Sequence, residues 1–387
     1  MNFTHLHVHT EYSLLDGSNK INEYVARVKE LGMNSAAITD HGVMFGCIDF
    51  YRAAKAAGIK PILGCEVYVA PGSRFDREIG QAEDRYYHLV LLAENNHGYE
   101  NLMKIVSKAF VDGFYYKPRV DMDLLQEYHE GIIALSACLA GEVAKNITRG
   151  MYEEAKSAAL RYEKIFGKGN FFLELQDHGI PQQQRVNQQL LRMSQETGIA
   201  LVATNDVHYT YDTDAEAHDI LLCVQTRKLL SDENRMRYEG GQYYVKSPEE
   251  MAELFPYIPE ALENTQKIAD RCEVEIEFGV TKLPKFDVPA PYTSWEYLNK
   301  LCYDGLKERY SGDLTELEKR LEYELGVIKT MGYVDYFLIV WDFIRFARDH
   351  DIMVGPGRGS AAGSLFPIRW ELRSWTLLNT IFCLSVF

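Results

Sequence analysis

The stretch that decides the fold is HLHVHTEYSLLDG, residues 5–17, in which three histidines alternate with apolar residues. Acidic and hydroxyl side chains follow at once. Alternate residues of a β-strand point to the same face, so His7 and His9 are expected side by side. We expect these two histidines to belong to a metal site that is completed by residues from elsewhere in the chain.

The composition limits the class of protein. A chain of 387 residues, 47% hydrophobic and 25% charged, is long enough for two or three globular domains. A net charge of −15 argues against general coating of nucleic acid, although it leaves room for a local basic groove. The seven cysteines are scattered without a C-x-x-C pair, which predicts free thiols in the cytoplasm. We expect neither a secretion leader nor a membrane span.

Short apolar runs alternate with amphipathic stretches over the first two-thirds of the chain. The runs cover residues 34–42, 59–69, 86–95, 131–141, 170–179 and 199–209. Between them, residues 21–32, 48–58, 98–110, 151–167 and 181–198 have the apolar spacing of helices. Alternating strands and helices predict an α/β fold with a parallel sheet. With the opening run as a seventh strand, the pattern favours a closed βα barrel.

Nearly every apolar run ends or begins with a side chain that can bind metal. These residues are His7, His9, His41, Glu66, His88, Cys138, Asp206 and His208. The loops at one end of a βα barrel converge, so the residues are expected to meet. Imidazole, carboxylate and thiolate together suit zinc, manganese or iron, and their number suggests two or three ions. The alternative for each residue is an ordinary place in the core.

Several polar residues near these positions are assigned other roles. Glu174 and His178 lie at another strand end and are candidates for supporting or substrate-binding groups, and Asp40 for orienting a ligand imidazole. The remaining histidines have no such context, so we expect surface or packing roles for His5, His97, His129, His178, His218 and His350.

Five stretches carry a resemblance to a known family: HLHVHTEYSLLDG, AITDHG, GCEVYV, ATNDVHY and VGPGRGSAAGSL. Over roughly residues 1–365, the chain resembles the bacterial DNA polymerase III α subunits. The resemblance implies that residues 1–280 form a PHP (polymerase and histidinol phosphatase) domain, a distorted seven-stranded βα barrel. It also implies up to three bound ions and a 3′–5′ exonuclease or phosphoesterase activity. The implied metal ligands are His7, His9, Asp16, His41, Glu66, His88, Cys138, Asp206 and His208.

Two other functions remain open for this site. It can be a structural metal site that only stabilises the fold, since binding free energy for distant ligands is also folding free energy. It can also belong to a free-standing phosphatase for a small ester such as histidinol phosphate. That alternative does not account for the glycine-rich VGPGRGSAAGS, residues 354–364.

The composition and periodicity of the sequence change after the first domain. Residues 281–294 are rich in proline and are expected to be a linker, and residues 295–365 a mainly helical start of a polymerase palm and thumb region. The aromatic stripe of residues 331–349 is expected to be core. Glycines and an arginine allow close approach to phosphate. The resemblance implies that Gly357, Arg358, Gly359 and Ser360 contact a nucleotide triphosphate.

Residues 366–387, FPIRWELRSWTLLNTIFCLSVF, depart from the family pattern. The family continues with paired aspartates that bind the Mg²⁺ ions of polymerisation, and this stretch contains no aspartate. We expect an aberrant tail from a frameshift or truncation, with a natural hydrophobic helix as the alternative. The chain as given is therefore not expected to synthesise DNA.

The resemblance also implies partners for the full-length protein. These are primer–template DNA and deoxynucleotides, together with a sliding clamp, a clamp loader and a proofreading subunit, all in the cytoplasm and without a membrane.

Overall fold

The computed structural model describes residues 2–78, 84–280 and 282–354. The chain divides into two compact units, Met1–Ile276 and Glu277–Phe387. Each unit is described by itself. Within the described ranges, no helix combines the length and the apolar character that crossing a membrane requires.

The first unit is built on one mixed sheet of eight strands among the described residues. The strands are β1 (Ser35–Ile38), β2 (Lys60–Val69), β3 (Tyr87–Ala93), β4 (Phe114–Tyr115), β5 (Lys117–Val120), β6 (Ile132–Leu135), β7 (Phe171–Leu175) and β8 (Leu201–Ala203). Their order is β4-β5-β2-β3-β6-β7-β8, with β1 also paired to β2. The neighbours β1–β2, β6–β7 and β7–β8 are parallel, which is the arrangement predicted from the alternation of strands and helices.

Two features differ from a regular parallel barrel. Strand β3 is antiparallel to both β2 and β6, because residues 70–86 connect it to β2 without an intervening described helix. The opening run is not a continuous strand, yet it hydrogen-bonds on both edges. Val207 N donates to His7 O on one side, and Thr39 N donates to Val8 O on the other. The run therefore links β1 to the segment after β8.

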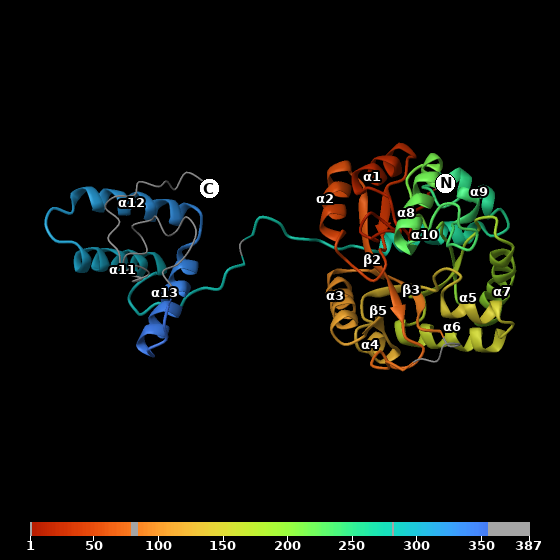
Figure 1. The fold of residues 1–387 in the computed structure, drawn as a ribbon, viewed down its shortest axis with the longest axis horizontal. Coiled ribbons are helices and arrows are strands. Elements are labelled where there is room, and N and C mark those ends of the chain that lie inside the picture. The colour runs from red at the N-terminus through yellow and green to blue at the C-terminus, as the bar shows by residue number, and fades with distance from the viewer. Residues whose placement is uncertain (1, 79–83, 281, 355–387) are drawn as a thin grey trace. The chain divides into compact units, whose positions relative to one another are not determined.

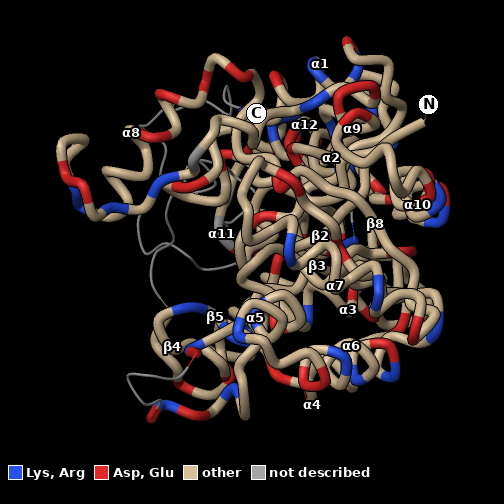
Figure 2. The backbone as a smooth tube through the Cα atoms, turned by 90° about the vertical axis from the view of Figure 1, so that its right-hand side faces the viewer, with Lys and Arg blue, Asp and Glu red and all other residues tan. Residues whose placement is uncertain are grey.

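Helices surround this sheet (Figure 1). They are α1 (Ile21–Glu30), α2 (Cys47–Ala57), α3 (Asn96–Val111), α4 (Met122–Glu127), α5 (Glu142–Thr148), α6 (Tyr152–Phe166), α7 (Pro181–Thr197), α8 (Ala215–Thr226), α9 (Pro248–Leu254) and α10 (Pro259–Arg271). Gly58 and Gly198 end α2 and α7 in the left-handed conformation, which glycine adopts without steric cost. Figure 2 shows charged residues along outer helices such as α6, whereas β3 and β8 carry none.

Alternate residues of the strands build two separate cores. Leu63 and Leu91 face outward and pack in the cluster that contains Tyr24 and Ile105 of the helices. Their neighbours Ile62, Leu92 and Ile133, with Leu6 and Val202, form a second cluster that also holds Ile268 and Ala269 of α10. Each fully buried aliphatic side chain contributes about 1.5–3 kcal/mol. Apolar packing thus fills the centre of the sheet, with α10 against it.

The second unit contains three helices among its described residues: α11 (Ser294–Arg309), α12 (Thr315–Thr330) and α13 (Val334–Asp349). Leu298, Leu325 and Trp341 are among the residues of its core. The aromatic stripe expected to be core is only partly buried, since Phe343 and Phe346 are 67% and 56% exposed. They lie on the face of α13 turned away from the buried Leu338 and Trp341, because a helix can bury only one stripe against its neighbours.

Candidate metal centre

The nine predicted ligands lie together at one end of the sheet. Three groups have ligand atoms within 4.8 Å of one another: His9–His41–His208, His7–His9–Glu66 and His41–Glu66–His88. The other three predicted ligands adjoin these groups. Asp206 Oδ1 is 3.2 Å from His7 Nε2, Asp16 Oδ2 is 3.0 Å from His41 Nε2, and Cys138 Sγ is 3.8 Å from His88 Nδ1. The structure therefore brings all nine side chains together.

Strand directions explain why these residues meet. His41 follows parallel strand β1, and Asp206 follows parallel strand β8, so both lie at the carboxyl ends. His88 is near the amino end of β3, but β3 runs antiparallel and brings that end to the same edge. Backbone strain gathers here as well, because Asp206 and Ala137 have φ values of +44° and +62°. Non-glycine residues at positive φ are uncommon and often mark functional sites.

Glu174 fixes the proton of His7. Glu174 Oε1 lies 2.6 Å from His7 Nδ1, and a carboxylate only accepts hydrogen bonds, so Nδ1 carries the hydrogen. The other nitrogen, Nε2, is therefore the one that can offer a lone pair to a cation. It faces Glu66 Oε1 at 3.3 Å and Asp206 Oδ1 at 3.2 Å.

A short relay orients His9 in the same way. The Ser13 hydroxyl donates to Asp40 Oδ1 at 2.7 Å, so Ser13 Oγ accepts from His9 Nδ1 at 3.1 Å. Nε2 of His9 then also presents a lone pair, 3.2 Å from Asp206 Oδ1. Asp40 was expected to orient a ligand imidazole. Its oxygens instead bind Thr10 and Ser13, and its influence on His9 passes through the serine.

Nδ1 of His208 donates a hydrogen bond to the backbone carbonyl oxygen of Asp206, at 2.7 Å. Its Nε2 lies 3.1 Å from the hydroxyl of Tyr238, which comes from the segment between α8 and α9. Three histidines thus use Nδ1 for orientation and direct Nε2 into the cluster. This is the arrangement that metal-binding histidines adopt, with the second nitrogen held by a carboxylate or carbonyl.

Several buried atoms of the cluster have no hydrogen-bond partner in the described structure. They are His7 Nε2, His9 Nε2, His41 Nδ1 and Nε2, Asp16 Oδ1, Glu66 Oε2 and Asp206 Oδ1. An imidazole lone pair about 3 Å from a carboxylate oxygen is repulsive unless a proton or cation lies between them, and leaving such buried groups unmatched is costly. Divalent cations would offset this repulsion, so the donor set fits a metal cluster.

The electrostatics of the cluster point the same way. Burial alone would raise the pKa of Glu66, but His88, His41 and His7 outweigh it and hold that pKa well below the usual range. Burial would lower the pKa of His41, yet Glu66 and Asp16 raise it to about 10. Burial and the carboxylates of Glu66 and Asp206 raise the pKa of the Cys138 thiol well above its usual value. The site is a strong concentration of negative charge around imidazole groups.

Three other buried histidines differ, because in them it is Nε2 that binds a backbone carbonyl. Nε2 contacts Lys246 O in His5, Asn205 O in His178 and Asp16 O in His218, at 2.7–2.9 Å. His178 also accepts from the side chain of Gln183 and stacks on Tyr243 with ring centroids 3.8 Å apart. These contacts are those of packing residues.

Tyr238 and Ser13 are site residues that the sequence reasoning missed. Tyr238 lies in a polar segment without periodicity, and nothing in its surroundings distinguishes it from a surface tyrosine. Ser13 lies within the opening run, and its proximity to His9 was the available signal. The predicted phosphate loop, Gly357, Arg358, Gly359 and Ser360, lies outside the described residues, as does the predicted aberrant tail 366–387.

Comparison with known families gives two matches. Residues 5–178 match the PHP domain, and residues 296–371 match the family described as the bacterial DNA polymerase III alpha NTPase domain. The first match contains seven of the nine clustered residues, all except Asp206 and His208.

Curated relatives named DNA polymerase III subunit alpha match nearly the whole chain. The protein from Treponema pallidum is 49% identical over 98% of this chain and 33% of its own length. Those from Borreliella burgdorferi and Thermus aquaticus are 48% and 40% identical over 94% of this chain, and over 32% and 35% of their own lengths. The chain therefore spans about a third of the length of these relatives.

Solved structures show weaker likenesses. An amidohydrolase from Chromobacterium violaceum has a TM-score of 0.36 and 13% identity, over 54% of this chain and 88% of that one. A putative metal-dependent phosphoesterase from Bifidobacterium adolescentis has a TM-score of 0.33 and 15% identity with the same coverage. Likenesses at this level carry no argument about the site.

Proposed function

Since the chain belongs to the family of bacterial DNA polymerase III α subunits, we propose that it forms the N-terminal part of a replicative DNA polymerase. Its first unit is then a PHP domain that hydrolyses the terminal phosphodiester of a DNA strand in the 3′–5′ direction. The observation that carries this proposal is the convergence of the oriented Nε2 atoms of His7 and His9 on the carboxylates of Glu66 and Asp206.

Nine side chains hold the ions in this proposal. They are His7, His9, Asp16, His41, Glu66, His88, Cys138, Asp206 and His208. Together they provide enough donors for two or three ions of zinc, manganese or iron. Bound there, such ions supply Lewis acidity to water and to the phosphoryl oxygens.

The residues around the cluster have their own parts in the reaction. Glu174, Ser13 and the Asp206 carbonyl keep the three Nδ1 hydrogens in place, which fixes the rings before substrate arrives. The Tyr238 hydroxyl is positioned at the edge of the cluster to donate to a phosphoryl oxygen. Glu66 and Asp206, both buried, provide the negative charge that retains the cations.

The full-length protein is proposed to carry out DNA-directed DNA synthesis with Mg²⁺ in the cytoplasm. Its partners are then primer–template DNA, deoxynucleotides, the sliding clamp, the clamp loader and a proofreading subunit. Gly357, Arg358, Gly359 and Ser360 are proposed to bind the triphosphate. Polymerisation also needs a pair of carboxylates that position two ions, and the stretch 366–387 contains no aspartate. This chain by itself is therefore proposed to be inactive in synthesis.

The experiment compares the wild-type chain with Asp206→Asn, using 5′-labelled single-stranded DNA and a small phosphate monoester, in zinc or manganese. We expect stepwise shortening of the DNA from its 3′ end by the wild type and its loss in Asp206→Asn. His129→Gln, which changes a half-buried histidine outside the cluster, should retain the activity.

Two results would overturn the proposal. Bound metal without hydrolysis of either substrate would indicate a structural metal site. Turnover of the monoester without turnover of DNA would indicate a small-molecule phosphatase.

A further inference from the structure

Two dipeptides, Arg85–Tyr86 and Tyr116–Lys117, extend the candidate metal centre toward the surface. Tyr68 connects them to it, because its ring is 5.3 Å from that of His88 and 6.2 Å from that of His41. We call these five residues, Tyr68, Arg85, Tyr86, Tyr116 and Lys117, the tyrosine rim.

The members of the tyrosine rim hold one another in place. The ring of Tyr86 lies edge-on to Tyr68 at 4.9 Å and stacks parallel to His88 at 6.1 Å. Lys117 Nζ is 5.2 Å from the centre of the Tyr68 ring. Arg85 Cζ is 4.3 Å from the centre of the Tyr116 ring, within the range of a cation–π interaction. Each dipeptide thus contributes one ring and one cation.

Tyr116 is held at the surface by a strained turn. Tyr115 of β4 pairs with Lys117 of β5, so Tyr116 alone forms the tip of this hairpin, with φ of +61°. This conformation costs a non-glycine residue about 1 kcal/mol or more. The ring is nevertheless 61% exposed, so burial of the side chain does not offset the cost. A large exposed ring at a position that favours glycine indicates a functional role for the Tyr116 side chain.

The cations of the tyrosine rim are free to bind an anion. Among the described residues, neither Arg85 nor Lys117 forms an ion pair with a carboxylate. Nearby cations do, since Lys145 and Arg149 both pair with Asp84. The two cations lie beside one exposed ring, that of Tyr116, and one half-buried ring, that of Tyr86.

We propose that the tyrosine rim binds the 3′-terminal nucleotides of single-stranded DNA as the strand enters the metal centre. Bases stack on Tyr116 and Tyr86, and backbone phosphates pair with Arg85 and Lys117. Exposed rings interleaved with cations are the usual means of binding a single strand, and each stacked base is worth about 1–3 kcal/mol. This inference rests on the proposed function and names the substrate of that site. A small monoester has no preceding nucleotides, so it does not use the rim.

The test measures binding separately from hydrolysis. The metal-loaded chain is titrated into a fluorescent oligothymidylate with 3′ phosphorothioate linkages, which resist hydrolysis, and anisotropy is followed at low salt. We expect Tyr116→Gly to weaken binding about 5- to 100-fold, because stacking is lost. Tyr116→Gly should fold like the wild type, because glycine adopts positive φ without steric cost. The double variant Arg85→Ala, Lys117→Ala should bind the oligothymidylate more weakly than the wild type does. Its affinity should also depend less on salt concentration.

The matched control is Phe114→Ala. Phe114 is a 52% exposed residue on the same hairpin, and its ring contact among the described residues is with Phe110 and not with the tyrosine rim. This variant should bind the oligonucleotide like the wild type. Phe114→Ala should also turn over bis(p-nitrophenyl) phosphate at the wild-type rate, since this small diester needs only the metal centre.

The outcomes separate the two proposals. Wild-type affinity in Tyr116→Gly, or no binding by the wild type itself, would overturn the tyrosine rim. If that happened while Asp206→Asn still abolished DNA hydrolysis, the proposed function would stand. Weakened binding in Tyr116→Gly but not in Phe114→Ala supports the rim, even if hydrolysis is absent and the proposed function fails.

Discussion

The two units of the chain bury different kinds of side chain. The first unit buries His7, His9 and Glu66 in contact with one another, with polar atoms that have no hydrogen-bond partner. The core of the second unit consists of apolar residues such as Leu325 and Leu338, with partly buried aromatic rings packed against it. The difference predicts that the stability of the first unit depends on the proposed cations, whereas that of the described part of the second unit depends on packing.

The largest expected effect separates the units by their response to metal. A chelator should lower the free energy of unfolding of the first unit by about 3 kcal/mol or more, the linkage expected at a 100-fold excess of metal over its dissociation constant. Hydrogen exchange followed by mass spectrometry should show faster exchange in β2, β3 and β8 and unchanged exchange in α11–α13. Equal acceleration in both units would contradict this difference.

A smaller effect is expected from Glu174→Gln. This variant replaces the carboxylate that accepts the hydrogen bond of His7 Nδ1 with an uncharged amide. Metal affinity should fall about 10- to 100-fold, the usual result of losing such an outer partner. Competition with a metal-binding dye measures it. The control is Glu154→Gln, an exposed carboxylate on α6, which should leave affinity unchanged. Identical affinities for the two variants would show that Glu174 does not support the cluster.

The third prediction uses pH to sharpen the contrast. Burial, only partly offset by the Asn205 carbonyl, lowers the pKa of His178 to about 4. In the unfolded chain, His178 therefore binds a proton near pH 6.5, whereas in the folded chain it binds one only near pH 4. Between pH 7 and pH 5 this should cost the first unit about 1–2 kcal/mol, and the loss should be complete below pH 4.

Urea denaturation at pH 7 and pH 5, with chelator present throughout, measures this loss in the free energy of unfolding. His178→Gln should reduce the loss of stability toward low pH. The second unit contains a single histidine, the exposed His350, so its stability should change little over this interval. A pH dependence that is unaltered in His178→Gln would contradict the assignment.

The smallest effect is expected in the second unit. Asp335 Oδ1 accepts from the backbone N–H of Phe286 and from the Ser294 hydroxyl, at 3.0 and 2.8 Å. Asp335→Asn should cost about 1 kcal/mol, the usual net worth of a hydrogen bond, and speed exchange in α13. Metal content should stay the same. A change in metal content would break the separation of the units.

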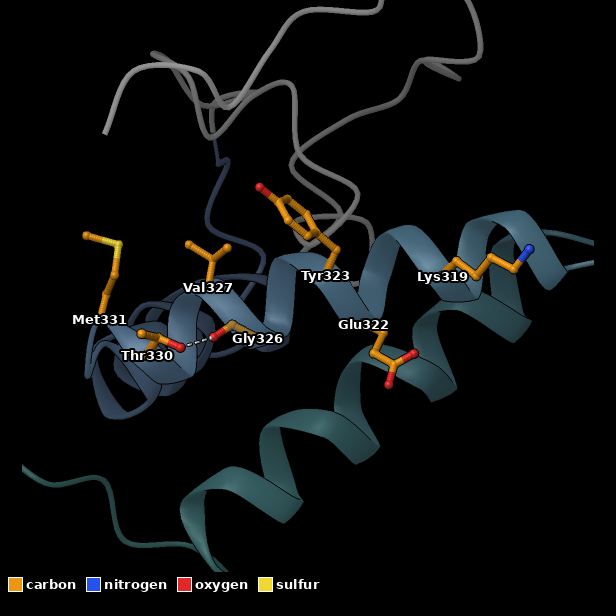
Figure 3. Close-up of a pocket in the computed structure, with 7 residues that line it drawn as sticks. All are labelled: Lys319, Glu322, Tyr323, Gly326, Val327, Thr330 and Met331. Atoms are coloured by element: carbon orange, nitrogen blue, oxygen red, sulfur yellow. Dashed lines mark hydrogen bonds between the residues drawn. The ribbon is translucent and has the colours of Figure 1, made fainter.

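The exposed face of α12 is a second contrast with the first unit. Figure 3 shows Tyr323, Val327 and Met331 along this helix, with the Thr330 hydroxyl turned onto the Gly326 carbonyl. Together with Lys319 and Glu322 these residues line a shallow pocket. It offers no cluster of ionisable groups comparable to that around Glu66.

The sequence predicted the parts of the fold that local periodicity determines. The alternation of strands and helices and the placing of eight of the nine clustered residues at strand ends follow from spacing, whereas Asp16 was implied only by the family resemblance. The direction of β3 did not, because it depends on how residues 70–86 travel, and an apolar run has no direction. His88 nevertheless lies with the other clustered residues, because it is near the start of its strand and antiparallel pairing brings that end to the same edge.

Contacts made only in three dimensions were not accessible. Tyr238 reaches His208 across 30 positions, and the Ser13–Asp40 relay depends on a turn whose shape the sequence does not state. The partial exposure of Phe343 and Phe346 was missed because an aromatic stripe does not reveal how many helices pack against it.

The most direct test of the central claim is anomalous-scattering crystallography of the zinc- or manganese-loaded chain, with data on both sides of the metal absorption edge. The account predicts two or three anomalous peaks within bonding distance of His7 Nε2, His9 Nε2, Glu66 and Asp206. An absence of peaks at these atoms in metal-loaded crystals would contradict it.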